Sequence, residues 1–261
     1  MTVFDDPAYK TAFQQFRRMR PDMFDRYLAC LERPDIPDGQ ALDVGCGPGL
    51  QAEMLLERLP APWTLTALES SLDMAAAARQ WLSRFGARFS VRESRLEDLP
   101  DELNPSFDVA WLSEVAHLLG NAAQWTARLG SLMKPGGRIL IRTSTHAQLK
   151  EREWYQFFPS ALPVDLARHP DREALNKALS LAGFNHIVTT TIDESRPIEK
   201  DFFYSMMQNK AFSTLHDIEP NAFEEGLRLL RTHLIGKSEV KWCYEMTAYT
   251  ATFVGGPIEH Y

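Results

Sequence analysis

The chain has 261 residues, of which 44% are hydrophobic and 24% are charged, a balance typical of a folded globular protein. Its formal net charge of −7 argues against the basic surface that nucleic-acid binding requires. No apolar run approaches the roughly 20 residues of a membrane-spanning helix, and the first residues lack a signal-peptide pattern. We therefore expect neither a nucleic-acid nor a membrane partner.

The cysteines are few and scattered. Cys30, Cys46 and Cys243 form no CxxC pair, so the sequence predicts no zinc or other metal site and no disulfide framework. Reduced thiols fit a cytoplasmic location.

The first predicted elements are helical. Residues 7–31 carry apolar side chains at helical spacing, and Pro21 interrupts them and starts a second helix. From residue 41 onward, short apolar strands alternate with amphipathic helices. Strands are predicted at 41–44, 63–68, 88–91, 107–112, 138–143 and 187–192, and helices at 51–59, 72–85, 122–133 and 171–182. Such alternation predicts an α/β fold, a doubly wound and mostly parallel sheet with helices on both faces.

Two late segments fall outside this alternation. Residues 145–170 are rich in aromatic side chains, and residues 194–237 predict helices at 200–210 and 221–234 before a last strand at 240–254. Neither segment is long enough for a core of its own, so we interpret them as substrate-cap insertions. The prediction is a single domain over residues 1–261, with an N-terminal helical lid at 1–38 and a ligand-binding core at 39–192.

The most informative motif is a glycine-rich turn between a strand and a helix. Asp43 precedes it, and Gly45, Cys46, Gly47 and Gly49 form it. Glycine lets a ligand approach the backbone closely, and the helix that follows offers free N–H groups. The spacing matches neither GxGxxG nor a P-loop. An acid before the turn repels a pyrophosphate but can organise a loop around a cationic ligand.

A second acid supports this interpretation. Glu69 ends the next strand, about 20 residues after the glycines, which is the offset of a carboxylate that binds ribose hydroxyls.

At this point the sequence resembles the class I S-adenosylmethionine-dependent methyltransferases, in particular the ubiquinone-type and natural-product group. The resemblance covers most of residues 15–190, through 42–49, 68–74, 94–100, 107–117 and 132–137, and residues 242–253 suit the family's antiparallel last strand. It implies a seven-stranded sheet and S-adenosylmethionine as the donor, with S-adenosylhomocysteine as product. The donor-binding residues that it implies are Arg20, Asp43, Gly45, Cys46, Gly47, Gly49, Glu69, Ser70, Met74, Arg95, Leu96 and Ser113.

One position departs from the family pattern. Arg95 stands where an aspartate usually contacts adenine, and arginine cannot accept a hydrogen bond from the adenine amino group. Either the backbone at Leu96 and a neighbouring acid, Glu97 or Asp98, take over this contact, or Arg95 stacks on the ring.

Methyl transfer needs a base only if the acceptor must lose a proton. The candidates are His117, just past the fourth strand, and Glu114. Each also has a structural interpretation, as a capping or packing histidine and as a solvated acid.

The substrate side is less defined. Arg142, near the end of a strand, is predicted either to bind an acidic substrate group or to form an internal ion pair. Side chains that could line an apolar substrate pocket, or simply form core, are Trp154, Tyr155, Phe158 and Phe203.

These observations favour an enzyme that methylates an O, N or S atom of a small aromatic or acidic molecule. The alternatives are a non-catalytic S-adenosylmethionine-binding or scaffold protein, and an RNA or protein methyltransferase. The sequence leaves open whether the chain is a monomer or a homodimer.

Overall fold

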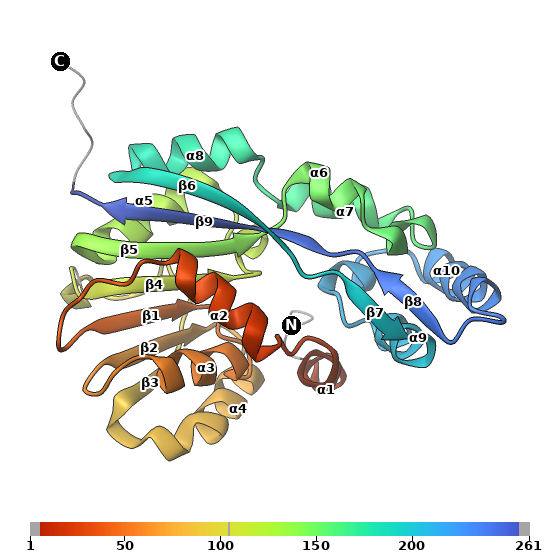
Figure 1. Cartoon of the computed structure of the whole chain (residues 1–261), viewed down its shortest axis with the longest axis horizontal. Coiled ribbons are helices and arrows are strands. Elements are labelled where there is room, and N and C mark those ends of the chain that lie inside the picture. The colour runs from red at the N-terminus through yellow and green to blue at the C-terminus, as the bar shows by residue number, and fades with distance from the viewer. Residues whose placement is uncertain (1–5, 104, 256–261) are drawn as a thin grey trace.

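The structure is a computed structural model and describes residues 6–103 and 105–255. The first five residues of the predicted lid, residue 104 of the predicted core and residues 256–261 of the predicted domain lie outside the described residues. A seven-stranded sheet with the order β3-β2-β1-β4-β5-β9-β6 forms one half of the molecule, and a helical cap forms the other (Figure 1). This confirms the predicted fold class.

The main-sheet strands are β1 (Gln40–Val44), β2 (Thr64–Glu69), β3 (Phe89–Glu93), β4 (Phe107–Ser113), β5 (Met133–Thr143), β6 (Phe184–Asp193) and β9 (Glu245–Phe253). The helices are α1 (Pro7–Phe16), α2 (Pro21–Cys30), α3 (Leu50–Arg58), α4 (Leu72–Leu82), α5 (Ala122–Leu132), α6 (His146–Lys150), α7 (Ala161–Arg168), α8 (Arg172–Leu181), α9 (Lys200–Gln208) and α10 (Pro220–His233). Strands β1 to β5 pair in parallel, and β9 pairs antiparallel with both β5 and β6.

Alternating side chains divide the sheet into two faces, because successive residues of a strand point to opposite sides. On β4, Trp111 packs toward α2 and α3, whereas Leu112 packs toward α5 and α8. Both side chains are fully buried. Helices on both faces leave the carboxyl ends of β1, β2 and β4 as the open edge, which is where ligands bind in such sheets.

Local signals set the helix boundaries. Proline occupies the first turn of α1, α2 and α10, where its missing N–H costs no helical hydrogen bond. The Ser71, Asn121 and Asp171 side chains accept hydrogen bonds from the first-turn N–H groups of α4, α5 and α8.

The predicted last strand at 240–254 is divided in two, which corrects the prediction. Residues Glu239–Trp242 form β8, which pairs with the unpredicted strand β7 (Arg196–Glu199) in a separate two-stranded sheet. At the junction the Tyr244 N–H donates to the Ser195 hydroxyl at 2.9 Å instead of to a backbone carbonyl. A side chain thus interrupts the ladder, and β7 and β8 continue β6 and β9 out into the cap (Figure 1).

Strand β5 also begins earlier than predicted. The Lys134–Gly137 turn lies within it, because Met133 already pairs with Phe107 before the register shifts to Val109 and Arg138. The turn therefore bulges out of a longer strand.

The cap contains a hydrophobic cluster of its own. It combines residues from both insertions with Ala12 and Phe16 of α1, and its largest fully buried members are Trp154 and Phe158. None of the helices among residues 6–103 and 105–255 has the length and apolar character that crossing a membrane requires.

Close packing in the cap generates a test. A Cβ on Gly226 of α10 would lie 2.5 Å from the Phe158 ring and 2.6 Å from the Phe157 carbonyl oxygen. We expect Gly226→Ala to lower the free energy of unfolding by about 1–3 kcal/mol through overpacking, measured by urea unfolding. Glu224→Ala, at an exposed position of the same helix, is the control. Equal stability of the two variants would contradict this packing of α10.

Candidate active site

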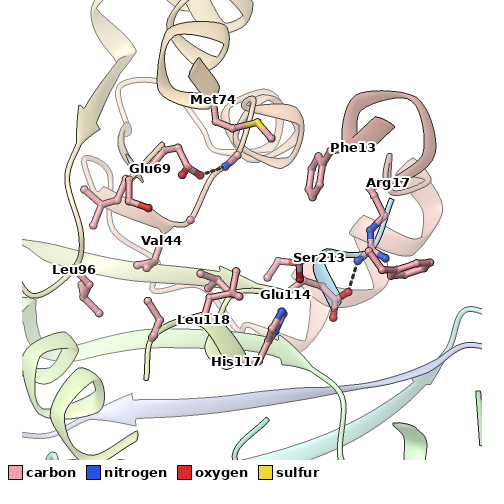
Figure 2. A pocket seen from close by; sticks show the side chains of 18 of the residues that line it. Phe13, Arg17, Val44, Glu69, Met74, Leu96, Glu114, His117, Leu118 and Ser213 are labelled. Carbon is pink, nitrogen blue, oxygen red and sulfur yellow. Dashed lines mark hydrogen bonds and ion pairs between the residues drawn. The ribbon is translucent and has the colours of Figure 1, made fainter. Parts of the chain in front are cut away.

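A cavity of about 300 Å³ lies at the carboxyl ends of β1, β2 and β4, beneath α1 and beside the cap. Figure 2 shows side chains converging on it from the sheet, from α1 and from the cap residue Ser213. The predicted donor or catalytic residues that line it are Gly45, Gly47, Glu69, Ser70, Met74, Arg95, Leu96, Ser113, Glu114 and His117.

Glu69 is fixed at one end of the cavity by backbone hydrogen bonds. Its Oε2 accepts from the Gly47 N–H at 2.9 Å (Figure 2), and its Oε1 accepts from the Ser71 N–H at 2.8 Å. These contacts join the glycine turn to the end of β2. Both oxygens of the carboxylate are therefore oriented by the backbone at the cavity wall.

The glycines of the turn are required by space and conformation. Gly45 has φ of +71°, and a Cβ there would lie 2.5 Å from Val115 Cγ2. Gly49 has φ of +90° and precedes the first residue of α3. Both angles fall in the left-handed region that favours glycine. The turn backbone is therefore held against the chain that follows β4, and its N–H groups lie at the cavity.

Asp43 lies buried beneath this turn. Its Oδ2 has no hydrogen-bond partner among residues 6–103 and 105–255. Burial, and secondarily the charge of Glu69, raise the pKa of the Asp43 carboxyl to about 8. A buried, unpaired carboxyl at this position fits a positively charged ligand, because a nearby cation would favour its ionised form.

The adenine side of the cavity carries both apolar and charged groups. Met74 and Leu96 are buried beneath it, whereas Arg95 is exposed and pairs with Glu97 at 3.6 Å at the rim. Arg95, Leu96 and Glu97 line the cavity, whereas Asp98 does not; their contacts with an adenine ring stay a prediction.

The opposite end is highly charged. Glu114 Oε2 accepts from Arg17, at the end of α1, at 2.5 Å (Figure 2), and from the Tyr244 hydroxyl at 3.0 Å. Burial alone would raise the pKa of Glu114, but the guanidinium groups of Arg142, Arg17 and Arg152 outweigh it and hold that pKa below its ordinary range. Glu114 also has φ of +58°, a strained backbone conformation that proteins retain mainly at functional sites.

His117 lies next to this charged group and stacks on His169, with ring centroids 4.4 Å apart and planes at 11°. Burial, and then the neighbouring His169, lower the pKa of His117 to about 3. Its ring is neutral at physiological pH. Its buried Nδ1 has no hydrogen-bond partner in the part of the chain that the structure describes.

Arg20 does not line this cavity, which corrects its expected place. It precedes the first residue of α2, and its guanidinium pairs with Asp22 at 2.8 Å on the surface. Arg17, three residues earlier at the end of α1, is the lid arginine that reaches the cavity. Arg20 instead lines a smaller cavity of about 110 Å³ on the other side of the Arg17–Glu114 pair.

The residues expected on the substrate side also lie elsewhere. Arg142 donates through Nε and Nη2 to the two carboxylate oxygens of Glu194 at 2.8 and 2.9 Å. Of the two roles predicted for Arg142, the structure therefore shows the internal ion pair. The predicted aromatic residues do not line the main cavity, because their rings form the core of the cap: Trp154, Tyr155, Phe158 and Phe203. The remaining donor predictions, Asp43, Cys46 and Gly49, support the turn from behind rather than line the cavity.

Sequence reasoning missed the cap residues that do line the cavity, namely Arg152, Asp165, His169 and Phe212. The aromatic residues of the insertions were predicted to line a pocket because of their residue type. A single Arg152 or His169 in an irregular segment gives no periodic pattern from which its position could be predicted.

The geometry can now be compared with known proteins. Residues 14–189 match the model of the methyltransferase domain family. The chain belongs to this methyltransferase family. The match spans most of the chain and includes the glycine turn, Glu69 and His117.

Relatives and a solved structure agree with this membership. The chain is 28% identical over 156 residues to a probable chloroplastic tocopherol O-methyltransferase of Oryza sativa subsp. japonica, covering 58% of this chain and 42% of that protein. It is 34% identical over 119 residues to trans-aconitate 2-methyltransferase of Rhizobium meliloti (strain 1021), covering 42% and 40%. The matched segments thus span less than half of each relative.

A structure of Haemonchus contortus phosphoethanolamine N-methyltransferase 2 with S-adenosyl-L-methionine superposes with a TM-score of 0.60 at 15% identity, covering 95% of this chain and 56% of that one. At this identity, the likeness concerns the fold.

The pKa of Asp43 predicts a pH dependence of stability. Its folded value of about 8 exceeds the ordinary value of 3.8, so the folded protein retains a proton that the unfolded chain releases. Stability therefore falls as pH rises through this window. We expect Asp43→Asn, which lacks this proton, to gain melting temperature relative to wild type from about pH 4 to about pH 8, with a constant difference above that.

Thermal melts across this pH range provide the measurement, and Asp38→Asn at an exposed position is the control. A wild-type profile parallel to that of Asp43→Asn would show that Asp43 ionises normally.

Proposed function

We propose that this protein transfers a methyl group from S-adenosylmethionine to an O, N or S atom of a small aromatic or acidic molecule. The observation that carries the proposal is that one cavity joins a donor end, built from the glycine turn and Glu69, to a charged and partly enclosed end beside the cap. The donor supplies an already activated methyl group, so the protein must mainly bind, orient and exclude water.

Binding follows from the residues of the donor end. Glu69 is placed to accept hydrogen bonds from the ribose hydroxyls, and Met74 and Leu96 offer apolar contact to the adenine. The buried carboxyl of Asp43 lies behind the turn, where its charge favours a cationic donor. Phe13 and Tyr9 of α1 lie over the cavity and limit access of water.

His117 and Glu114 differ in what they can do. Glu114 is held ionised by its arginine neighbours, so its role is to position Arg17 rather than to take a proton. His117, in the tautomer with its proton on Nε2, has a free Nδ1 that can accept a hydrogen bond from an acceptor hydroxyl or amine. Its low pKa suits orientation of the acceptor better than complete proton abstraction.

The first test is donor binding. We expect wild-type protein to bind S-adenosylmethionine and S-adenosylhomocysteine with micromolar affinity in calorimetry, and Glu69→Ala to lose about tenfold or more by losing charge-assisted hydrogen bonds. Glu93→Ala is a matched control, because Glu93 pairs in register with Glu69 on β3 but does not line the cavity. Absence of binding to wild type would support a non-catalytic protein that has lost this ligand.

The second test concerns His117 and uses any acceptor found by screening for S-adenosylhomocysteine production. We expect His117→Ala to slow methyl transfer by about 10- to 100-fold, less than loss of a full general base, while donor binding stays within about twofold. Because the pKa of His117 is lowered to about 3, the wild-type rate should show no inflection near pH 6.5 from this residue. His186→Ala, at an exposed position, is the control. If the wild-type rate shows an inflection near pH 6.5 that disappears in His117→Ala, His117 acts as a full general base.

A further inference from the structure

The cavity wall formed by the cap contains an arginine without a carboxylate partner. Arg152 follows α6, is only 7% exposed and lines the cavity. Among residues 6–103 and 105–255, no carboxylate oxygen lies within 4.0 Å of its guanidinium nitrogens. The other buried arginines nearby are paired, Arg17 with Glu114 and Arg142 with Glu194.

The hydrogen bonds and stacking contacts of Arg152 are to uncharged groups, and Glu114 acts on its guanidinium only from beyond ion-pair distance. Nη2 donates to the Ser144 hydroxyl and contacts Met246 Sδ at 3.3 Å. The guanidinium carbon stacks 4.2 Å from the centroid of the Tyr244 ring. Nε is buried without a hydrogen-bond partner in the described part of the chain. Burying such a charge is costly unless an anion or further hydrogen bonds compensate it.

Asp165, the acid that the cap contributes to the cavity wall, already has hydrogen-bond partners. Asp165 accepts hydrogen bonds from the Tyr155 hydroxyl and the Thr214 hydroxyl, each at 2.5 Å, through its two carboxylate oxygens. It forms no ion pair with the described cations. Asp165 therefore does not act as the partner of Arg152.

The position of Arg152 separates it from the donor end. The donor residues come from β1, β2 and the loop after β3, whereas Arg152 contacts Ser144 beyond β5 and Met246 of β9. Strand β4 lies between β1 and β5 in the sheet, and its end carries Glu114 and His117. An anion at Arg152 would thus belong to a molecule on the far side of His117 from the glycine turn.

We infer that Arg152 binds a carboxylate of the methyl acceptor, which makes the acceptor a small carboxylic acid. This inference rests on the proposed function and adds the charge of the substrate to it. A single unpaired guanidinium matches a monoanion, and a phosphate monoester would bring a charge of about −1.5 to −2. Arginine is well suited to this contact because its planar group offers paired N–H donors to a carboxylate.

The test compares matched acids and amides on protein saturated with S-adenosylhomocysteine. Calorimetry would use benzoate against benzamide, hexanoate against hexanamide, and phenyl phosphate. We expect at least one carboxylate to bind wild type about tenfold or more tightly than its amide. That preference should disappear in Arg152→Gln, remain in part in Arg152→Lys, and remain fully in Lys150→Gln, an exposed control on α6.

Binding of S-adenosylhomocysteine to each variant separates this inference from the proposed function. We expect Arg152→Gln to bind S-adenosylhomocysteine with the affinity of wild type. If its affinity for S-adenosylhomocysteine falls as much as its affinity for the carboxylic acid, Arg152 holds the donor carboxylate and the inference is overturned. Amides binding as well as acids to wild type, no binding of either acid, or tighter binding of phenyl phosphate would also overturn it. Failure of wild type to bind S-adenosylhomocysteine would instead count against the proposed function. If Arg152→Gln does not fold, the ratio of acid affinity to amide affinity in wild type and in Arg152→Lys still tests the inference.

Discussion

The ion pair between Arg17 and Glu114 connects the parts of the molecule that form the cavity. Arg17 comes from the lid helix α1, and Glu114 comes directly after β4. The Tyr244 hydroxyl, just before the antiparallel strand β9, donates to the same Glu114 oxygen. Two buried charges are stable in a protein interior only with good geometry and further hydrogen bonds. The lid, the end of β4 and the start of β9 must therefore come together at one point for this pair to form.

A second pair extends this arrangement. Arg142 of β5 binds both oxygens of Glu194, and the Tyr27 hydroxyl of α2 donates to the same carboxylate at 2.6 Å. Removing one partner of such a group leaves a buried charge uncompensated, which costs far more than the pair contributes when it is intact. The two pairs thus act mainly as constraints on position. They fix where the lid and cap meet the sheet, and the cavity is the space that remains.

The glycine turn and Glu69 could be placed together from the sequence because their signals are local, whereas their binding of the donor stays a prediction. Strand, glycine turn and acid occur within residues 40–70, and each has one structural meaning, so Gly45, Gly47 and Glu69 were found where the structure places them. Which residues of the cap line the cavity depends on which face of each irregular segment points inward, and the sequence does not reveal this. Trp154 and Arg152 are two residues apart, yet the first packs in the cap core and the second lines the cavity. Residue type alone suggested the reverse. Likewise, nothing in the sequence distinguishes Arg20 from Arg17 until the helix has a defined orientation.

The continuation of β6 and β9 into β7 and β8 has a mechanical consequence. Two strands run side by side from the main sheet into the cap, and their pairing is interrupted at the boundary, where the Ser195 hydroxyl replaces a carbonyl at Tyr244. Bending at this joint moves both strands together. Because Tyr244 also contacts Glu114, a displacement of the cap would be transmitted directly to the end of β4. The position of the cap and the position of the central strand are therefore coupled through one pair of strands.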